Sequence, residues 1–181
     1  ESNPTQCAFA YPEPDIVASL SDAKNLIYEP CPQGLPLARE AVCAYYETLG
    51  VRLSPDQVFL TASTSEAYSF LFRLLSDPGD NILFPQPSYP LFQFLVDLND
   101  LQMRNYRLRY SENRWHLDMA HLRDMRTPRS RAIVVVNPNN PTGSSFTVAE
   151  REELTAFSQQ SGIPLICDEV FLDYSFDPRR P

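Results

Sequence analysis

The sequence is poor in several features that mark other protein classes. Only one of its 181 residues is a lysine, and the formal net charge is -8. Nucleic-acid binding is led by Lys and Arg, so this charge argues against a nucleic-acid partner, although a local Arg pocket for a small anion stays open. No apolar run approaches the roughly 20 residues of a membrane span. These shortages argue against a nucleic-acid partner and against a membrane partner.

Cysteine is sparse and unpatterned. The four cysteines form no CxxC pair and have no metal-ligand spacing, so no metal site and no disulfide framework is predicted. We therefore expect reduced thiols and a cytoplasmic protein. The chain begins at Glu1 without an initiator Met or an apolar signal segment, and it stops at Pro181 directly after a strand-like stretch. We expect both ends to be cuts through a longer protein.

What the chain does contain is the composition of a packed globular domain, with 43% hydrophobic and 12% aromatic residues. Residues 1–27 resemble an extended arm with a short helical stretch near residues 16–20. Beyond them, strand-like and helix-like segments alternate, which predicts an α/β fold of three layers, α/β/α, with a mainly parallel sheet. Strands are predicted at 57–61, 81–84, 102–107, 132–136 and 164–167, and helices at 38–49, 64–76, 90–99, 117–125 and 147–160. The strands 132–136 and 164–167 are expected to be buried on both faces.

Ligands of such sheets bind outside the carboxyl ends of the strands, so the residues after each strand are the informative ones. After the first predicted strand, Ser63 and Glu66 have the spacing of a capping box, which predicts a helix start there. Helical N–H groups and the hydroxyls of Thr64 and Ser65 suit a phosphate. Taken alone, the pattern favours a capped helix that binds nothing. The apolar face of this helix is predicted from five residues, Ala67, Phe70, Leu71, Leu74 and Leu75.

Three further strand ends carry distinctive residues. Tyr89 lies in a loop stiffened by prolines, where it stacks on a flat heteroaromatic ring or, equally well, covers the core. The run Asn137–Gly143 presents amide side chains from a turn fixed by prolines and a glycine, and so specific a run favours function over a simple turn. Asp168 follows a buried strand, and a protonated pyridine nitrogen would be a suitable partner for its charge. A surface aspartate that starts a loop is the alternative.

Together, these residues resemble the class I/II aminotransferases of fold type I, which are pyridoxal-phosphate enzymes. The resemblance runs from about Asn3 to the end of the chain, and its most specific parts are Asn137–Gly143 (NPNNPTG) and Asp168–Phe171 (DEVF). It implies that residues 28–181 are an incomplete cofactor-binding large domain and that residues 1–27 are an arm or small-domain segment. It also implies an amino acid and a 2-oxo acid as substrates, and a homodimer.

The resemblance assigns roles to the residues that match the motifs. Ser63, Thr64 and Ser65 would hold the phosphate of pyridoxal 5'-phosphate, and Tyr28 would reach the phosphate of the neighbouring subunit. A second set would hold the ring and the substrate. In this set, Tyr89 would stack on the ring and Asp168 would pair with the ring nitrogen. Asn140 would bond both the phenolic oxygen of the ring and the substrate. Ala8 would lie near the substrate carboxylate.

Several positions depart from the family pattern. Phe171, at the cofactor site, stands where the family usually has a tyrosine, Ser63 where glycine is common, and Ala8 where glycine often lies near the substrate. The only lysine, Lys24, lies in the arm, far from the expected position of the lysine that binds the cofactor covalently. We therefore expect the chain alone to be inactive and to contain no catalytic residue. The alternatives are another fold type I enzyme, such as a C–S lyase, a decarboxylase or a synthase, and a non-catalytic binding or regulatory module.

Overall fold

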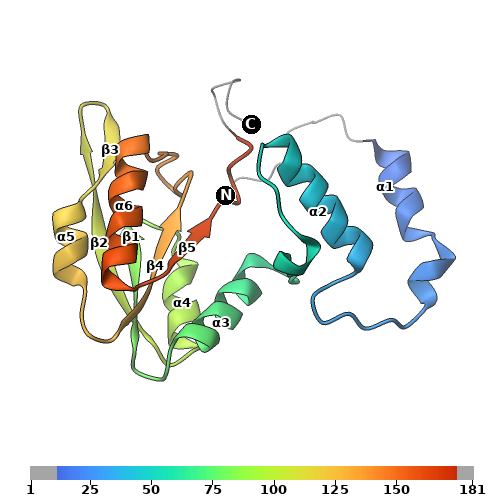
Figure 1. The fold of residues 1–181 in the computed structure, drawn as a ribbon, viewed down its shortest axis with the longest axis horizontal. Helices are drawn as coiled ribbons and strands as arrows, with labels where there is room; N and C mark the ends of the chain where they lie inside the picture. The colour runs from blue at the N-terminus through green and yellow to red at the C-terminus, as the bar shows by residue number, and fades with distance from the viewer. Residues whose placement is uncertain (1–11, 175–181) are drawn as a thin grey trace. The chain divides into compact units, whose positions relative to one another are not determined.

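The computed structural model describes residues 12–174 (Figure 1). The chain divides into two compact units, Glu1–Leu60 and Thr61–Pro181. The predicted division at residue 27 concerns the domains of the whole protein and stays a prediction. Among the described residues, no helix has both the length and the apolar character needed to cross a membrane.

The first unit is made of short helices joined by loops. Its elements are α1 (Glu13–Leu20), the 3-10 helix η2 (Ala23–Leu26), α2 (Pro36–Thr48) and the 3-10 helix η3 (Pro55–Gln57). The helical stretch predicted near residues 16–20 and the helix predicted at 38–49 are both present. The guanidinium of Arg39 on α2 donates to the Gln33 side chain (2.9 Å) and to the Pro55 carbonyl (2.8 Å), which joins the loop before α2 to the start of η3.

The strand predicted at 57–61 is wrong. Ser54 begins η3 instead, because its hydroxyl accepts from the Asp56 N–H while the Gln57 side chain accepts from the Ser54 N–H. The N–H of Leu60 then donates to the Gln33 carbonyl, at 2.9 Å, in place of a sheet partner. Local side-chain capping therefore determines the conformation at the start of this segment, despite its β propensity.

The second unit is built on one five-stranded sheet with the order β3-β2-β1-β4-β5. Its strands are β1 (Asn81–Gln86), β2 (Gln102–Ser111), β3 (Arg114–Leu117), β4 (Ser130–Val136) and β5 (Leu165–Asp168). Strand β1 pairs in parallel with β2 and β4, and β4 pairs in parallel with β5. Only β3 is antiparallel to its neighbour, β2. The prediction of a mainly parallel sheet is confirmed.

Helices cover both faces of the sheet, which confirms the three-layer prediction (Figure 1). The helices are α3 (Thr64–Leu75), α4 (Leu91–Asp97), α5 (Met119–Met125) and α6 (Val148–Ser161). Alternate residues of β4 point to opposite faces, so Val134 packs with α3 and α4 while Ile133 packs with α5 and α6. The whole of 132–136 is buried, as predicted.

The predicted apolar face of α3 is displaced around the helix. Tyr68 and Phe72 are the buried residues of α3, whereas Phe70 and Leu74, predicted to face the core, are exposed. The helix carries apolar residues around most of its circumference, so spacing alone did not identify the side that packs on the sheet.

Sequence reasoning missed the β2–β3 hairpin. Strand β2 extends to Ser111 and turns through Glu112 and Asn113, which have φ values of 51° and 59°. Positive φ at both central residues is the geometry of a type I′ hairpin turn. The usual Asn-Gly signal is absent, and β3 has only four residues, so neither the turn nor the strand was apparent.

The prediction that 164–167 is a fully buried strand is wrong. Most of β5 is half-buried, and its Cys167 is exposed. Strand β5 pairs with β4 on one side, and no strand among residues 12–174 pairs with its other side. Asp168 is correspondingly half-buried rather than fully desolvated.

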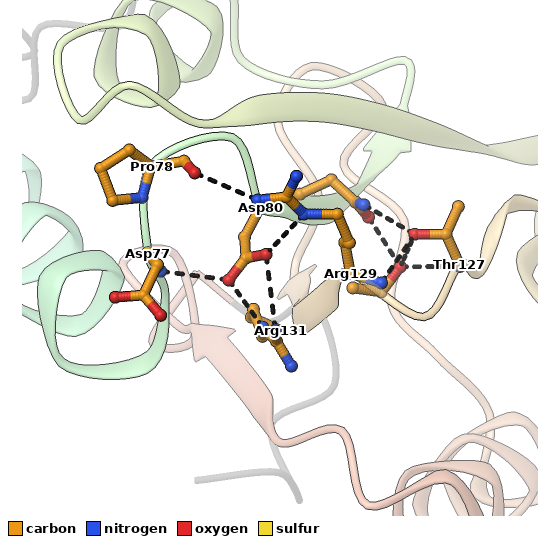
Figure 2. Close-up of polar contacts among 8 residues, drawn as sticks. Asp77, Pro78, Asp80, Thr127, Arg129 and Arg131 are labelled. Carbon is orange, nitrogen blue, oxygen red and sulfur yellow. Dashed lines mark hydrogen bonds and ion pairs between the residues drawn. The ribbon is translucent and has the colours of Figure 1, made fainter.

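A buried ion cluster fixes the amino ends of β1 and β4 (Figure 2). Asp80 is only 2% exposed, and its carboxylate accepts hydrogen bonds from Arg129 (3.0 Å), Arg131 (2.7 Å) and the Asp77 N–H (3.1 Å). The hydrogen bond from Arg131, with those from Asp77 and Arg129, holds the pKa of Asp80 well below its usual range. This cluster lies at the sheet edge opposite the strand ends Gln86, Val136 and Asp168, so it supports the fold and not the candidate site.

Glu150 connects the start of α6 to β3. The capping box predicted for Thr147 and Glu150 is present, and the Glu150 carboxylate also accepts from the Leu117 N–H (3.1 Å) and the Arg114 guanidinium (3.3 Å). Burial by itself raises the pKa of Glu150. The hydrogen bonds from Thr147, Leu117 and Arg114 outweigh burial and lower the pKa to about 2.

We expect Glu150→Ala to lower the free energy of unfolding by roughly 2 kcal/mol at neutral pH, because it leaves the Leu117 N–H without its partner. Urea unfolding measures this change. Glu153 lies on the same helix as Glu150, and Glu153→Ala removes its exposed ion pair with Arg123 of α5, which should cost less than about 1 kcal/mol. Because the pKa of Glu150 is depressed, its contribution is complete above the ordinary value of 4.5 and is lost as the pH falls toward 2. Equal losses for the two variants would contradict this role.

Candidate functional site

The carboxyl ends of three neighbouring strands lie together at one edge of the sheet. Strands β4 and β5 are paired up to Val136 and Asp168, and the Asn137 N–H donates to the Asp168 carbonyl at 2.9 Å. After β1, the Pro87 carbonyl accepts from the Asn139 side chain at 3.5 Å. Three of the segments singled out from sequence are thus neighbours.

The start of α3 presents several hydrogen-bond donors. Ser63 is the N-cap, and its hydroxyl accepts from the Glu66 N–H at 3.2 Å. The helix start predicted here is confirmed, although the Glu66 carboxylate accepts from the Ala62 N–H at 2.7 Å and not from the Ser63 N–H. Within the described part of the chain, the hydroxyls of Thr64 and Ser65 make no hydrogen bond. The N–H groups of a helix's first turn lack intrahelical acceptors, so these N–H groups and the two hydroxyls form a group of donors.

Asp168 places a carboxylate at this edge of the sheet. Its Oδ2 accepts from the Tyr68 hydroxyl at 2.8 Å, and its Oδ1 accepts from the Val170 N–H at 3.1 Å. Burial, together with the charge of Asp168 and the hydrogen bond to it, raises the pKa of Tyr68 far above its ordinary value. The phenol therefore stays protonated and remains a donor. Sequence reasoning missed Tyr68, since nothing in the local sequence indicates a partner so distant in the chain.

A cavity of about 150 Å³ is lined by residues of both α3 and β5. Thr64, at the start of the helix, and Asp168, at the end of the strand, both line it. The structure thus brings the predicted phosphate-binding residue and the predicted nitrogen-binding acid to one cavity. Apolar side chains form much of the remaining wall, namely Ala67, Leu71, Ile166 and Val170.

The asparagines of the loop after β4 have distinct roles. The Asn137 side chain accepts from the Phe146 N–H (2.9 Å), and the buried Asn139 side chain accepts from the Thr142 hydroxyl (2.8 Å). Gly143 has a φ of 68°, the left-handed conformation expected for it. The half-buried side chain of Asn140, by contrast, makes no hydrogen bond to another described residue. It is the asparagine of this loop left available to a ligand.

The other described residues predicted for the site do not line this cavity. Tyr89 is 44% exposed, and its ring meets Phe92 edge-on at a centroid distance of 6.0 Å. Phe171 is half-buried and packs against Tyr174 at 6.1 Å. Tyr28, 91% exposed, belongs to the first unit, as does Lys24 in η2. Ala8 lies outside the described residues. No cluster of His, Cys, Asp and Glu within residues 12–174 is arranged to hold a metal ion.

The sequence pattern of the family "Aminotransferase class I and II" matches residues 10–180. Nicotianamine aminotransferase 1 from Oryza sativa subsp. japonica is 34% identical over 158 residues, which are 87% of this chain and 32% of that protein. Tyrosine aminotransferase from Mus musculus is 29% identical over 168 residues, 91% of this chain and 37% of that protein. The chain thus spans about a third of the length of these curated relatives.

A solved alanine aminotransferase from Pyrococcus furiosus has a similar fold. It superimposes with a TM-score of 0.84 and 35% sequence identity, covering 94% of this chain and 44% of that chain. The similarity confirms the α/β fold expected of an incomplete large domain.

Proposed function

Because the chain belongs to the class I and II aminotransferase family, we propose that the protein containing it transfers an amino group between an amino acid and a 2-oxo acid. We further propose pyridoxal 5'-phosphate as its cofactor. The observation that carries the proposal is the cavity between α3 and β5, which Thr64 lines from one side and Asp168 from the other.

The chemistry of the available groups fits this cofactor. Thr64 and Ser65 offer hydroxyl and N–H donors, which suit a phosphate dianion. Asn140 has an uncommitted amide that can donate to a phenolic oxygen. Asp168 is an acceptor at the end of β5, where a protonated ring nitrogen can donate to it. Donors thus occupy the positions proposed for the anionic groups, and an acceptor occupies the position proposed for the cationic nitrogen.

Each residue has a separate task in the proposed reaction. Pyridoxal phosphate, when bound, supplies an electron sink for the carbanion formed at the substrate Cα. Asp168, as an anion, favours the protonated ring nitrogen on which that sink depends. Tyr89 would limit the tilt of the ring, and Asn140 would orient it by a hydrogen bond. Thr64 and Ser65 would anchor a group remote from the reacting atoms, and this binding energy aids orientation.

Amino transfer also requires a base that removes the Cα proton, commonly a lysine in such chemistry. Lys24 is the only lysine of this chain, and it lies in the first unit. We assign it no role. In the proposed protein, a homodimer of cytoplasmic location, the exposed Tyr28 would contribute to the neighbouring subunit's phosphate site.

Adding single amino acids to the intact protein loaded with pyridoxal phosphate tests the proposal. We expect at least one amino acid to convert the cofactor to its amino form, seen in the absorption spectrum, and a 2-oxo acid to reverse the change. Release of pyruvate and ammonia without an added oxo acid would indicate a lyase instead. A cofactor unchanged by every amino donor would refute amino transfer.

A further inference from the structure

Tyr68 is the buried residue of α3 whose polar atom reaches the candidate site. It is 5% exposed, and its ring packs against Phe72 (centroids 5.7 Å apart) and Phe92 (5.2 Å) in the aromatic core. The hydroxyl therefore has a fixed position, from which it donates to Asp168 Oδ2 at 2.8 Å. A residue that serves only packing would need no hydroxyl at this position.

The two hydrogen bonds to Asp168 fix the orientation of its carboxylate and leave acceptor positions on it unused. Tyr68 donates to one carboxylate oxygen and the Val170 N–H donates to the other. Each oxygen of an ionised carboxylate has two lone pairs, so positions remain for a further donor.

Tyr68 also connects two ends of the proposed cofactor site. It follows Thr64 by four residues, a rise of about 6 Å along the helix axis. The bond to Asp168 therefore joins the start of α3, where the phosphate is proposed to bind, to the end of β5, where the ring nitrogen is proposed to bind. Thr64 and Tyr68 line the same cavity as Asp168.

We propose that Tyr68 is a positioning residue. Its hydroxyl holds the Asp168 carboxylate in the orientation that accepts a hydrogen bond from the protonated ring nitrogen, and it sets the distance from that carboxylate to the start of α3. The inference rests on the proposed function and deepens it by adding a residue that acts on the cofactor through Asp168.

Tyr68→Phe in the intact protein tests this role, because it removes the hydroxyl and keeps the packed ring. Tyr106→Phe is the matched control. Tyr106 is fully buried in β2, and its hydroxyl donates at 2.8 Å to the carbonyl of Val134. Both variants lose one buried hydrogen bond, but only one of these bonds reaches Asp168.

Two measurements separate positioning from stability. The first is the infrared carboxylate band of Asp168 in the cofactor-free protein, assigned by its disappearance in Asp168→Asn. The second is the dissociation constant for pyridoxal phosphate. We expect Tyr68→Phe to shift the band and to weaken binding roughly tenfold, as for loss of a hydrogen bond to a charged group, and Tyr106→Phe to do neither.

An unshifted band and equal affinities in the two variants would overturn the inference while leaving the proposed function intact. Failure of the wild-type protein to bind pyridoxal phosphate would instead refute the proposed function, and with it the inference.

Discussion

Asp168→Asn in the intact protein is expected to slow removal of the substrate Cα proton by on the order of a hundredfold, while pyridoxal phosphate stays bound. The Asn amide carries no charge, so it cannot hold the ring nitrogen in its protonated form. The exchange of the Cα proton for deuterium in heavy water measures this step directly. The exchange rate does not depend on the second substrate.

Glu169→Gln is the control for this experiment. Glu169 is the next residue, lines the same cavity and is exposed, so the substitution removes one local negative charge without touching the Asp168 hydrogen bonds. We expect an exchange rate close to wild type. A similar fall in both variants would mean that the overall charge of the cavity matters rather than a specific contact of Asp168.

The second large effect is expected at the start of α3. Thr64→Ala combined with Ser65→Ala removes two hydroxyls that are free in the described structure, and pyridoxal phosphate binding should weaken by roughly a hundredfold or more. The remaining N–H groups of the helix start keep part of the affinity. Equilibrium dialysis against the cofactor gives the dissociation constant.

Ser69→Ala provides the comparison for this double variant, because Ser69 lies further along α3 and its hydroxyl accepts from the Asn99 side chain. Its affinity for the cofactor should equal that of the wild type. Unchanged affinity in the double variant would show that the phosphate binds elsewhere.

Strand ends were predictable from the sequence because they combine strong local signals. The β-branched run 132–136 is buried as expected, and it places the Asn137–Gly143 turn beside Asp168. Which asparagine is available was not predictable by spacing. It depends on the Asn137 and Asn139 side chains being used within the loop, and that is a property of the folded turn.

Contacts between segments distant in the sequence could not be predicted from local residue spacing. Tyr68 and Asp168 are 100 positions apart, and the apolar face predicted for α3 included Phe70 and Leu74, which are exposed. The Asp80 cluster likewise requires Arg129 and Arg131 to return beside β1. The false strand at 57–61 shows the converse, since capping by Ser54 determined that segment.

In the proposed site, an acid at the end of β5 faces the nitrogen of a phosphorylated ring bound at the start of α3. Nitrogen NMR of isotope-labelled pyridoxal phosphate on the intact protein tests it most directly. We expect the ring nitrogen to be protonated at neutral pH in the wild type and unprotonated in Asp168→Asn. An unprotonated nitrogen in the wild type, or the same signal in both proteins, would contradict it.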